Sequence, residues 1–474
     1  MKTECTSRAR TGKGKGSEQF MFSFAEGGPA VRMVFDADHI TSDAGLAPLR
    51  ELDERLGLTA LAASHLEDGR DPLMTVHPIG RLLRACVYAR AAGYEDGNDH
   101  TPLRDDPLMK AIVGGINKGS VNPKKQDGLA SEATLSRLWA GRKLHGRENF
   151  GAVHVSQFLK VLGKHAPDVL TLDIDGYDAA VHGGQQLGLF NGHFGHDCYY
   201  PLHVSVAEYG FIVGVQLRPG DSGPATGAAA LLEPILATLT KHLPRTKLRV
   251  RADAGFADPQ LYALCERKRV QYVIRRRMTT VIEQWFADYL DPLMEGHGPD
   301  DGAGEWFEEV WHEVKGWDRA RRHILKLAYD PATETVERYV LVTNSNKRDE
   351  NVWRMYGKRG QEEQRIDELK NHLRGEKFPS NQKHANDFRL HGMAMAYNLF
   401  AALRIVLPED HELKRATPMR LRSVLIKCGA MVRRTVRRMW LHVSRHWPHR
   451  AWLEDVCRVV LAPKLSPTPV WNSS

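Results

Sequence analysis

Apolar residues recur at two different periods along the chain, and the period changes near residue 168. Before this point, segments 46–66 and 79–92 carry apolar residues three and four positions apart, which is helical spacing. After it, Leu170, Leu172 and Ile174 alternate with polar residues, as in a strand with one apolar and one polar face. We therefore expect a helical region followed by a region that contains a β-sheet.

The segments after residue 168 follow one another in a definite order. Strands are predicted over 169–175, 200–206, 211–217, 248–253 and 270–275, and helices over 225–242 and 259–268. The chain thus forms a meander of strands first and then alternates between helix and strand. This order is typical of a mixed sheet in an α/β domain.

The rest of the chain is divided by changes in its pattern. Residues 278–344 interrupt the order with further alternating runs, which indicates a β-rich insertion, and helices are expected again over 356–373 and 390–407. The predicted organisation is a disordered basic tail (1–20), a helical N-terminal domain that is a candidate for DNA binding (21–165), the first part of the core (166–277), the insertion (278–344), the second part of the core (345–407) and a basic C-terminal region (408–474).

Composition narrows the class of partner. Lys and Arg outnumber Asp and Glu by 66 to 58, giving a net charge of +8 and a sequence pI of about 9.1, which favours an anionic partner such as nucleic acid. No apolar run reaches the roughly 18 residues of a membrane span, and the basic start is not followed by the apolar segment of a secretory signal. The six cysteines are scattered without a C-x-x-C pair. We expect a cytoplasmic protein, in a reducing compartment and without a membrane partner.

Positive charge gathers near the C-terminal end. Between residues 411 and 450 there are eleven Lys and Arg residues against Glu412 alone. Apolar residues interleave with these cations, which predicts a packed helix with one side that faces phosphates; the alternative is a solvated basic face. The candidate DNA contacts in this region are Arg433, Arg434, Arg437 and Arg438.

Two acidic residues stand where predicted strands end: Asp175 closes the first strand and Asp253 the fourth. Carboxylates at strand ends can converge in a cleft, where their oxygen atoms hold hard divalent cations. Two such ions about 3.5–4 Å apart can activate a water or a 3′-hydroxyl and stabilise the leaving oxygen in phosphoryl transfer. Acids at strand ends are usually solvated turn residues, so neither position is sufficient by itself. Asp173, on the same face as Asp175, is an alternative ligand.

A more specific pattern is Y-x2-R-x3-E-x6-K, formed by Tyr356, Arg359, Glu363 and Lys370. In a single helix these residues fall at i, i+3, i+7 and i+14, which share one broad face. That face would present a metal-binding carboxylate beside three groups that suit phosphate: a bidentate Arg, a point-charge Lys and a hydrogen-bonding Tyr. The alternative is an exposed helix with stabilising pairs such as Arg359–Glu363.

With this pattern the chain resembles the DDE transposases of bacterial insertion sequences, in the branch whose third acid lies in a Y-R-E-K signature. The resemblance implies a ribonuclease-H-like mixed-sheet core, with the β-rich insertion between the second and third acids. It extends from about residue 30 to about residue 450 and includes the segments 172–178, 182–185, 191–195, 198–202, 251–256, 420–422 and 432–438.

The resemblance implies a transposase that binds the terminal repeats of its mobile element and cleaves and joins DNA strands. Its partners would be double-stranded DNA at the element ends and at the target, and it would act as a homodimer in the DNA complex. The cofactor would be Mg²⁺, two ions per site, for which Mn²⁺ can substitute. The implied ligands are Asp175, Asp253 and Glu363, and the implied DNA-backbone contacts are Tyr356, Arg359 and Lys370.

Several of these assignments have alternatives. Asp175 is favoured over Asp173 because a glycine directly follows it, as in the related segment of the family. Glu362 neighbours Glu363 but lies one position off the signature spacing. Trp317 is a candidate for stacking on an unpaired base, against packing within the insertion. The alternative functions are an inactive DNA-binding regulator of transposition and a structure-specific nuclease on the same core.

Overall fold

The computed structural model describes residues 19–22, 31–34, 37, 39–95, 97–114, 128–141, 144–146, 150–297, 301–435 and 438–471. The predicted basic tail, 1–20, lies outside these residues except for its last two, which begin strand β1 (Gln19–Phe22). β1 pairs with β2 (Val31–Val34) in an antiparallel hairpin. The disorder expected for the tail stays a prediction.

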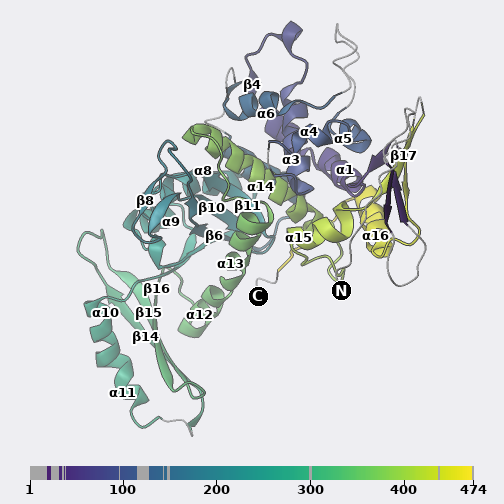
Figure 1. The fold of residues 1–474 in the computed structure, drawn as a ribbon. Coiled ribbons are helices and arrows are strands. Elements are labelled where there is room, and N and C mark those ends of the chain that lie inside the picture. Colours follow the sequence, from purple (N-terminus) through teal and green to yellow (C-terminus); the bar gives the residue numbers. More distant parts are fainter. Residues whose placement is uncertain are drawn as a thin grey trace, which may run out of the picture.

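A mixed sheet of eight strands organises the described chain (Figure 1). Its first five strands are β6 (Val169–Gly176), β10 (Leu202–Val206), β11 (Phe211–Gln216), β12 (Lys247–Ala252) and β13 (Gln271–Arg275). They lie in the order β11-β10-β6-β12-β13. β10 is antiparallel to both β11 and β6, whereas β12 is parallel to β6 and to β13. The predicted meander and the predicted mixed sheet are therefore confirmed, and with them the mixed α/β class.

The sheet continues through the segment that follows β13. β16 (Thr335–Thr343) pairs antiparallel with β13 and with β15 (Arg321–Asp330), which in turn pairs with β14 (Gly304–His312). A helical stretch not expected from the sequence packs on these strands around a small apolar core of its own, and the unit projects at the lower left of Figure 1. This stretch comprises α10 (Thr280–Trp285), the π-helix η5 (Phe286–Leu290) and α11 (Asp291–Met294).

The chain before the sheet is mostly helical, as the apolar spacing predicts. Its helices are α1 (Leu46–Leu56), α2 (Leu58–Ser64), α3 (Ile79–Ala91), α4 (His100–Leu103), α5 (Pro107–Ile112), α6 (Glu132–Trp139) and α7 (Ala152–Leu162). α2 packs on α3, and α7 packs on β11, so the helices share one continuous apolar core with the sheet. That residues 21–165 form a domain of their own stays a prediction.

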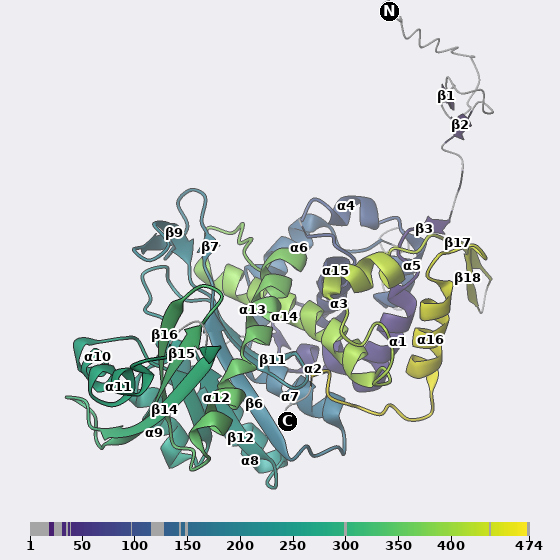
Figure 2. The same cartoon turned by 90° about the horizontal axis from the view of Figure 1, so that it is seen from below.

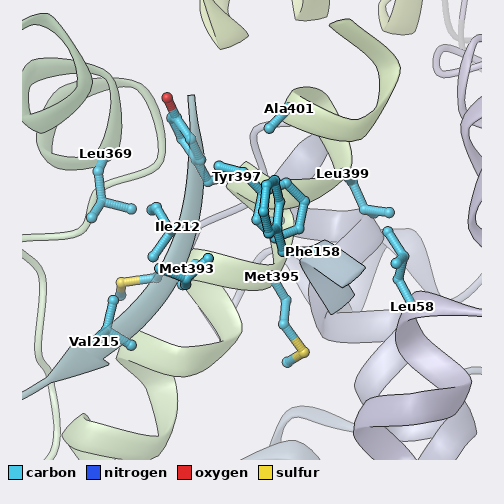
Figure 3. Close-up of a cluster of buried hydrophobic side chains, with 14 of the residues drawn as sticks. Leu58, Phe158, Ile212, Val215, Leu369, Met393, Met395, Tyr397, Leu399 and Ala401 are labelled. Carbon is cyan, nitrogen blue, oxygen red and sulfur yellow. The ribbon is translucent and has the colours of Figure 1, made fainter. Parts of the chain in front are cut away.

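The long helix α14 (Lys383–Val406) ties the sheet to these helices, since it packs against both β11 and α3 and is buried along most of its length. Figure 3 shows Tyr397 of this helix in the buried apolar cluster that also contains Ile212 of β11 and Phe158 of α7. α14 ends before Pro408, because the residue that precedes a proline is disfavoured in helical conformation. None of the described helices is both long enough and apolar enough to cross a membrane.

The signature region is not the single helix that the sequence predicts over 356–373. It consists of α12 (Asp349–Gly357), α13 (Gly360–Asp367) and the π-helix η7 (Glu368–His372). Glycines flank the break between α12 and α13, and glycine is roughly 1 kcal/mol less favourable than alanine inside a helix. The prediction that one helical face carries all four signature residues is therefore wrong.

The basic C-terminal region also differs from the predicted packed helix. Its elements are α15 (Pro418–Leu421), the π-helix η8 (Arg422–Ile426), β17 (Ala430–Arg434), β18 (Met439–Val443) and α16 (Arg450–Leu461). β17 and β18 form an antiparallel hairpin, and β17 also pairs with β3 (Ile40–Thr41). The helix prediction is wrong here because burial alternates: Val432 is buried while its neighbours Met431 and Arg433 are exposed, the period of a strand.

Candidate active site

Two acidic side chains lie at the carboxyl ends of adjacent parallel strands. Asp175 is the last residue but one of β6, and Asp253 follows directly after β12. The parallel register of the two strands places both residues at the same edge of the sheet. Each carboxylate accepts a hydrogen bond of 2.8 Å from a nearby backbone amide, Asp175 from Gly176 and Asp253 from Gly255. The structure thus brings the first two predicted acids together.

Asp175 is buried and close to other charges. Burial raises the pKa of its carboxyl to about 6; the charges of Arg359 and His203 oppose this rise, and that of Asp253 adds to it. The guanidinium of Arg359 forms an ion pair with Asp175. This carboxylate therefore already holds one cationic group, and its oxygens are the donors that a hard divalent ion prefers.

Asp173, the alternative to Asp175, is fully buried and occupied by other partners. Arg251 donates two hydrogen bonds to its carboxylate, one of 2.6 Å from Nε and one of 2.7 Å from Nη2. Nη1 of Arg365 lies 3.4 Å from the same carboxylate. Arg251 also donates a 2.7 Å hydrogen bond to the carbonyl of Met355 at the end of α12. These contacts favour a structural role for Asp173 and leave Asp175 as the better candidate ligand.

The neighbouring acids of α13 point in different directions. Glu362 is fully buried and accepts hydrogen bonds of 2.6 Å from His203, Ser205 and Arg365, which fixes α13 on β10. Burial would raise the pKa of Glu362, but the hydrogen bond from His203 and the charge of Arg365 hold it well below its usual range. Glu363, by contrast, is exposed. Glu362 is thus engaged inside the protein, and Glu363 is free to meet a ligand.

The described residues contain no group of three or more His, Cys, Asp or Glu side chains close enough to hold a metal ion. Glu363 lies four residues after Arg359, so it stands one helical turn from the group that contacts Asp175. The structure therefore pairs the first two acids and puts the third on the adjacent helix. That these three residues are the metal ligands stays a prediction.

The remaining signature residues have partners within the chain. Tyr356 packs on the apolar cluster around Val273 and Val352, and burial raises the pKa of its phenol. Lys370 donates a 2.8 Å hydrogen bond to Asp178, just after β6. Both side chains thus lie near the strand end that carries Asp175, and their contact with DNA stays a prediction.

An arginine-lined cavity of about 300 Å³ adjoins Asp253 and was not expected from the sequence. Arg276 donates a 2.7 Å hydrogen bond to His323, and Arg338 contacts Asp291 at 2.9 Å. The cavity is lined by residues that follow β12, by the end of β13 and the residues after it, and by β16: Asp253, Ala254, Arg275, Arg276, Arg277, Met278 and Arg338. A run of arginines in sequence was the available signal, but only the fold of the insertion brings Arg338 to it.

Other buried residues of the site were also not found from the sequence. His203, Ser205 and Arg365 carry no motif, and only the alternation of polar residues along β10 marks the first two as sharing a face. Arg365 lies outside the signature spacing. Their role as partners of Glu362 and Asp173 depends on contacts between elements far apart in the sequence.

Trp317, the candidate for base stacking, is engaged within the protein. Its ring stacks on His323 with centroids 5.7 Å apart and an interplanar angle of 7°, and the guanidinium of Arg321 lies 5.0 Å from its centroid. Trp311 on β14 is 63% exposed, so its ring is more accessible than the half-buried ring of Trp317. The packing alternative thus has contacts to support it, and base stacking by Trp317 stays a prediction.

The basic C-terminal side chains lie on the β17–β18 hairpin. Arg433, Arg434 and Arg438 are exposed, and Arg437 lies outside the described residues.

Lowering the pH from 7 to 5 is expected to destabilise the insertion by about 2 kcal/mol through His323. Burial lowers the pKa of His323 to about 3, with the charge of Arg276 acting in the same direction. Its stabilising contribution is therefore present above the ordinary pKa of 6.5 and is lost as the pH falls towards 3, because the unfolded chain takes up the proton first. Urea unfolding followed by tryptophan fluorescence at both pH values measures this loss. His323→Gln should reduce it and His193→Gln, an exposed control, should not; equal losses in both variants would contradict the assignment.

Comparisons with known proteins bear on this geometry. Residues 25–463 match the family described as Transposase DDE domain group 1. Among solved structures, the chain is similar to the piggyBac transposase in its synaptic complex with hairpin DNA, at 10% identity and a TM-score of 0.38 over 77% of each chain. A search of curated proteins finds no match. With the family match covering nearly its whole length, the chain belongs to the DDE transposases.

Proposed function

We propose that this chain binds the terminal repeats of its mobile element and catalyses cleavage and transfer of DNA strands. The observation that carries the proposal is the pair Asp175 and Asp253 at adjacent strand ends, with Arg359 at the start of α13 against the first of them. A meander of three strands followed by two parallel strands supports a ribonuclease-H-like core. A cytoplasmic location and a homodimer in the DNA complex belong to the same proposal and rest on the family resemblance.

In this proposal Asp175, Asp253 and Glu363 hold two Mg²⁺ ions, for which Mn²⁺ can substitute. The donor set supports this, because carboxylate oxygens suit hard cations and the raised pKa of Asp175 indicates a buried charge that a cation would stabilise. Glu363 follows Arg359 by one helical turn, which is consistent with its reaching the same place. When bound, the ions activate the attacking hydroxyl and stabilise the leaving oxygen.

The cationic groups around the two acids support a DNA substrate. Arg359, with Tyr356 and Lys370 nearby, would contact the backbone of the strand that is cut, since guanidinium and ammonium groups bind phosphate oxygens. The arginines of the cavity beside Asp253 extend this positive field on the other side. A polyanionic strand that passes between these groups would present its phosphate to both acids.

Strand cleavage in vitro tests the proposal, on DNA that carries the terminal repeats and their flanks, with Mg²⁺, Mn²⁺ or EDTA. Wild-type protein is expected to nick at the element boundary with either metal and not in EDTA. Glu363→Gln is expected to nick more than about a hundredfold more slowly, because loss of a partner outside the metal ligands already costs 10–100-fold. Glu350→Gln, the same change at an exposed position of α12, is the control and should cut normally.

Three outcomes would contradict the proposal. Nicking by Glu363→Gln at the wild-type rate would remove the third ligand from the assignment. Binding of the ends without nicking under any metal would favour an inactive regulator instead. A preference for branched DNA over the terminal repeats would favour the structure-specific nuclease.

A further inference from the structure

The β17–β18 hairpin presents positive charge that nothing in the described chain neutralises. Arg433, Arg434 and Arg438 are exposed, and none of their guanidinium groups has an acidic partner among the described residues. The sequence contains no Asp or Glu between Glu412 and Glu454. The hairpin therefore forms a basic ribbon, here defined as residues 430–435 and 438–443.

The two faces of the basic ribbon differ. On one face Ala430 is buried and packs with Leu441 and Val443 against Trp447 and Leu453, which come from α16 and the turn before it. This packing holds the ribbon on the body of the protein.

The opposite face has no cover in the described chain. In the strand register Met431 lies beside His442, and Arg433 beside Trp440. Met431 is 57% exposed, Trp440 49% and Ile40, which pairs with Met431 from β3, 54%. An apolar patch bordered by arginines is thus presented to the surroundings.

The outer half of the ribbon is only two strands wide. β3 pairs with Ala430 and Met431, and the last contact on that side is the 2.7 Å hydrogen bond from Val432 to the carbonyl of His39. Strands lie about 4.8 Å apart, so a two-stranded ribbon with its side chains fits the roughly 12 Å major groove of B-DNA. Arg433 and Arg434 lie in this outer half, and Arg438 lies at its turn end, where its carbonyl accepts a 2.8 Å hydrogen bond from the amide of Thr435.

We propose that the basic ribbon enters the major groove of duplex DNA. Arg433, Arg434 and Arg438 would contact phosphates and guanine edges, and Trp440 would contact apolar base edges such as thymine methyl groups. Charge decides for DNA over a second copy of the chain: a symmetric dimer through this face would bring like arginines together, which is unfavourable. The inference rests on the proposed function, since it supplies a contact to the same DNA.

The ribbon would hold DNA away from the bond that is cut. Figures 1 and 2 both place β17 at the end of the molecule opposite to β14 and β15, with β6, the strand that carries Asp175, between them. The duplex bound by the ribbon would therefore flank the cleavage site. This contact would add affinity and sequence readout but would not involve Asp175, Asp253 or Glu363.

DNA binding in EDTA, measured by fluorescence anisotropy over a range of KCl concentrations, tests the ribbon independently of catalysis. The triple variant R433A/R434A/R438A is expected to bind duplex about tenfold or more weakly and to reduce the slope of log affinity against log salt by about 2–3. The control K241A/R245A/K247A removes three exposed cations between the end of α8 (Ala228–His242) and the start of β12, at the other edge of the sheet from Asp253, and should change neither value much. Unchanged affinity and slope in the ribbon variant would overturn the inference.

Groove contact has its own measurement. Guanine N7 lies in the major groove, so wild-type protein should protect particular guanines of the terminal repeats from dimethyl sulfate, and the triple alanine variant should not. R433K/R434K/R438K keeps the charge and should restore the salt slope. Such recovery would show that the alanine variant had lost phosphate contacts and not its fold.

A variant that alters self-association but leaves DNA binding unchanged would show that a second copy covers this face instead. Wild-type protein that binds no duplex would overturn the proposed function itself, whereas binding and cleavage by the ribbon variant at wild-type levels would overturn the ribbon alone.

Discussion

Asp175→Asn is expected to slow strand cleavage by more than about a hundredfold and to leave the protein folded and bound to DNA. Asn keeps the size of the side chain but removes the charge that would hold a metal ion. Single-turnover nicking with Mg²⁺ measures the rate, and anisotropy measures the binding. The expected loss is larger than for most substitutions because the variant removes a candidate ligand itself rather than a group around it.

The stability of Asp175→Asn without metal can be measured independently of catalysis. Because burial raises the pKa of Asp175 to about 6 from its ordinary 3.8, the folded protein favours the protonated carboxyl. The stability this provides is present below about pH 4 and is lost as the pH rises through 6. In EDTA at pH 7, Asp175→Asn should therefore be at least as stable as the wild type.

Asp173→Asn, two residues earlier on the same strand, is the matched control. We expect it to destabilise the folded protein, which Asp175→Asn should not do. Removing its charge leaves the buried guanidinium of Arg251 without its bidentate partner and weakens the site of Arg365. Breaking a buried pair in this way costs about 3–5 kcal/mol. A stable Asp173→Asn variant that does not cut, beside an Asp175→Asn variant that does, would reverse the assignment of the two acids.

The sheet could be predicted from the sequence because its signal is local. Along β6 the apolar residues alternate, and the strand observed, Val169–Gly176, differs by one residue from the range predicted. The order of strands and helices then limits the topology to few arrangements, and places Asp175 and Asp253 at one edge. The polar face of β6 is buried as well as its apolar face, because Arg251, His203 and Arg365 reach that face from other elements.

The parts that could not be predicted depend on other elements. In the sequence, Val432 of the C-terminal region fits one position of an apolar helix face. Its place in a strand depends on pairing with β3 and β18. The break between α12 and α13 lies between two glycines, Gly357 and Gly360, whose effect on a helix is small, so tertiary contacts decide whether the helix continues. The arginine cavity needs the insertion to fold back on β13, which no local pattern specifies.

Glu362→Ala is expected to lower the free energy of unfolding by about 3–5 kcal/mol. The substitution leaves Arg365 buried without its nearest carboxylate and deprives His203 and Ser205 of their acceptor. Urea unfolding followed by circular dichroism measures the change. Cleavage should fall only as far as the folded fraction falls, and it should recover when the variant is assayed at low temperature.

Glu363→Ala, one residue on, is the matched control, and its effects should be the reverse. An exposed position without described partners should change stability by no more than about 0.5 kcal/mol. Cleavage, however, should be lost even in fully folded protein, since the third acid would be absent. A stable, inactive Glu362→Ala beside an unstable Glu363→Ala would reverse the assignment, with Glu363 as the buried carboxylate and Glu362 as the ligand. Because the two residues are adjacent on one helix, their different effects would distinguish the carboxylate that stabilises the fold from the carboxylate that binds the metal.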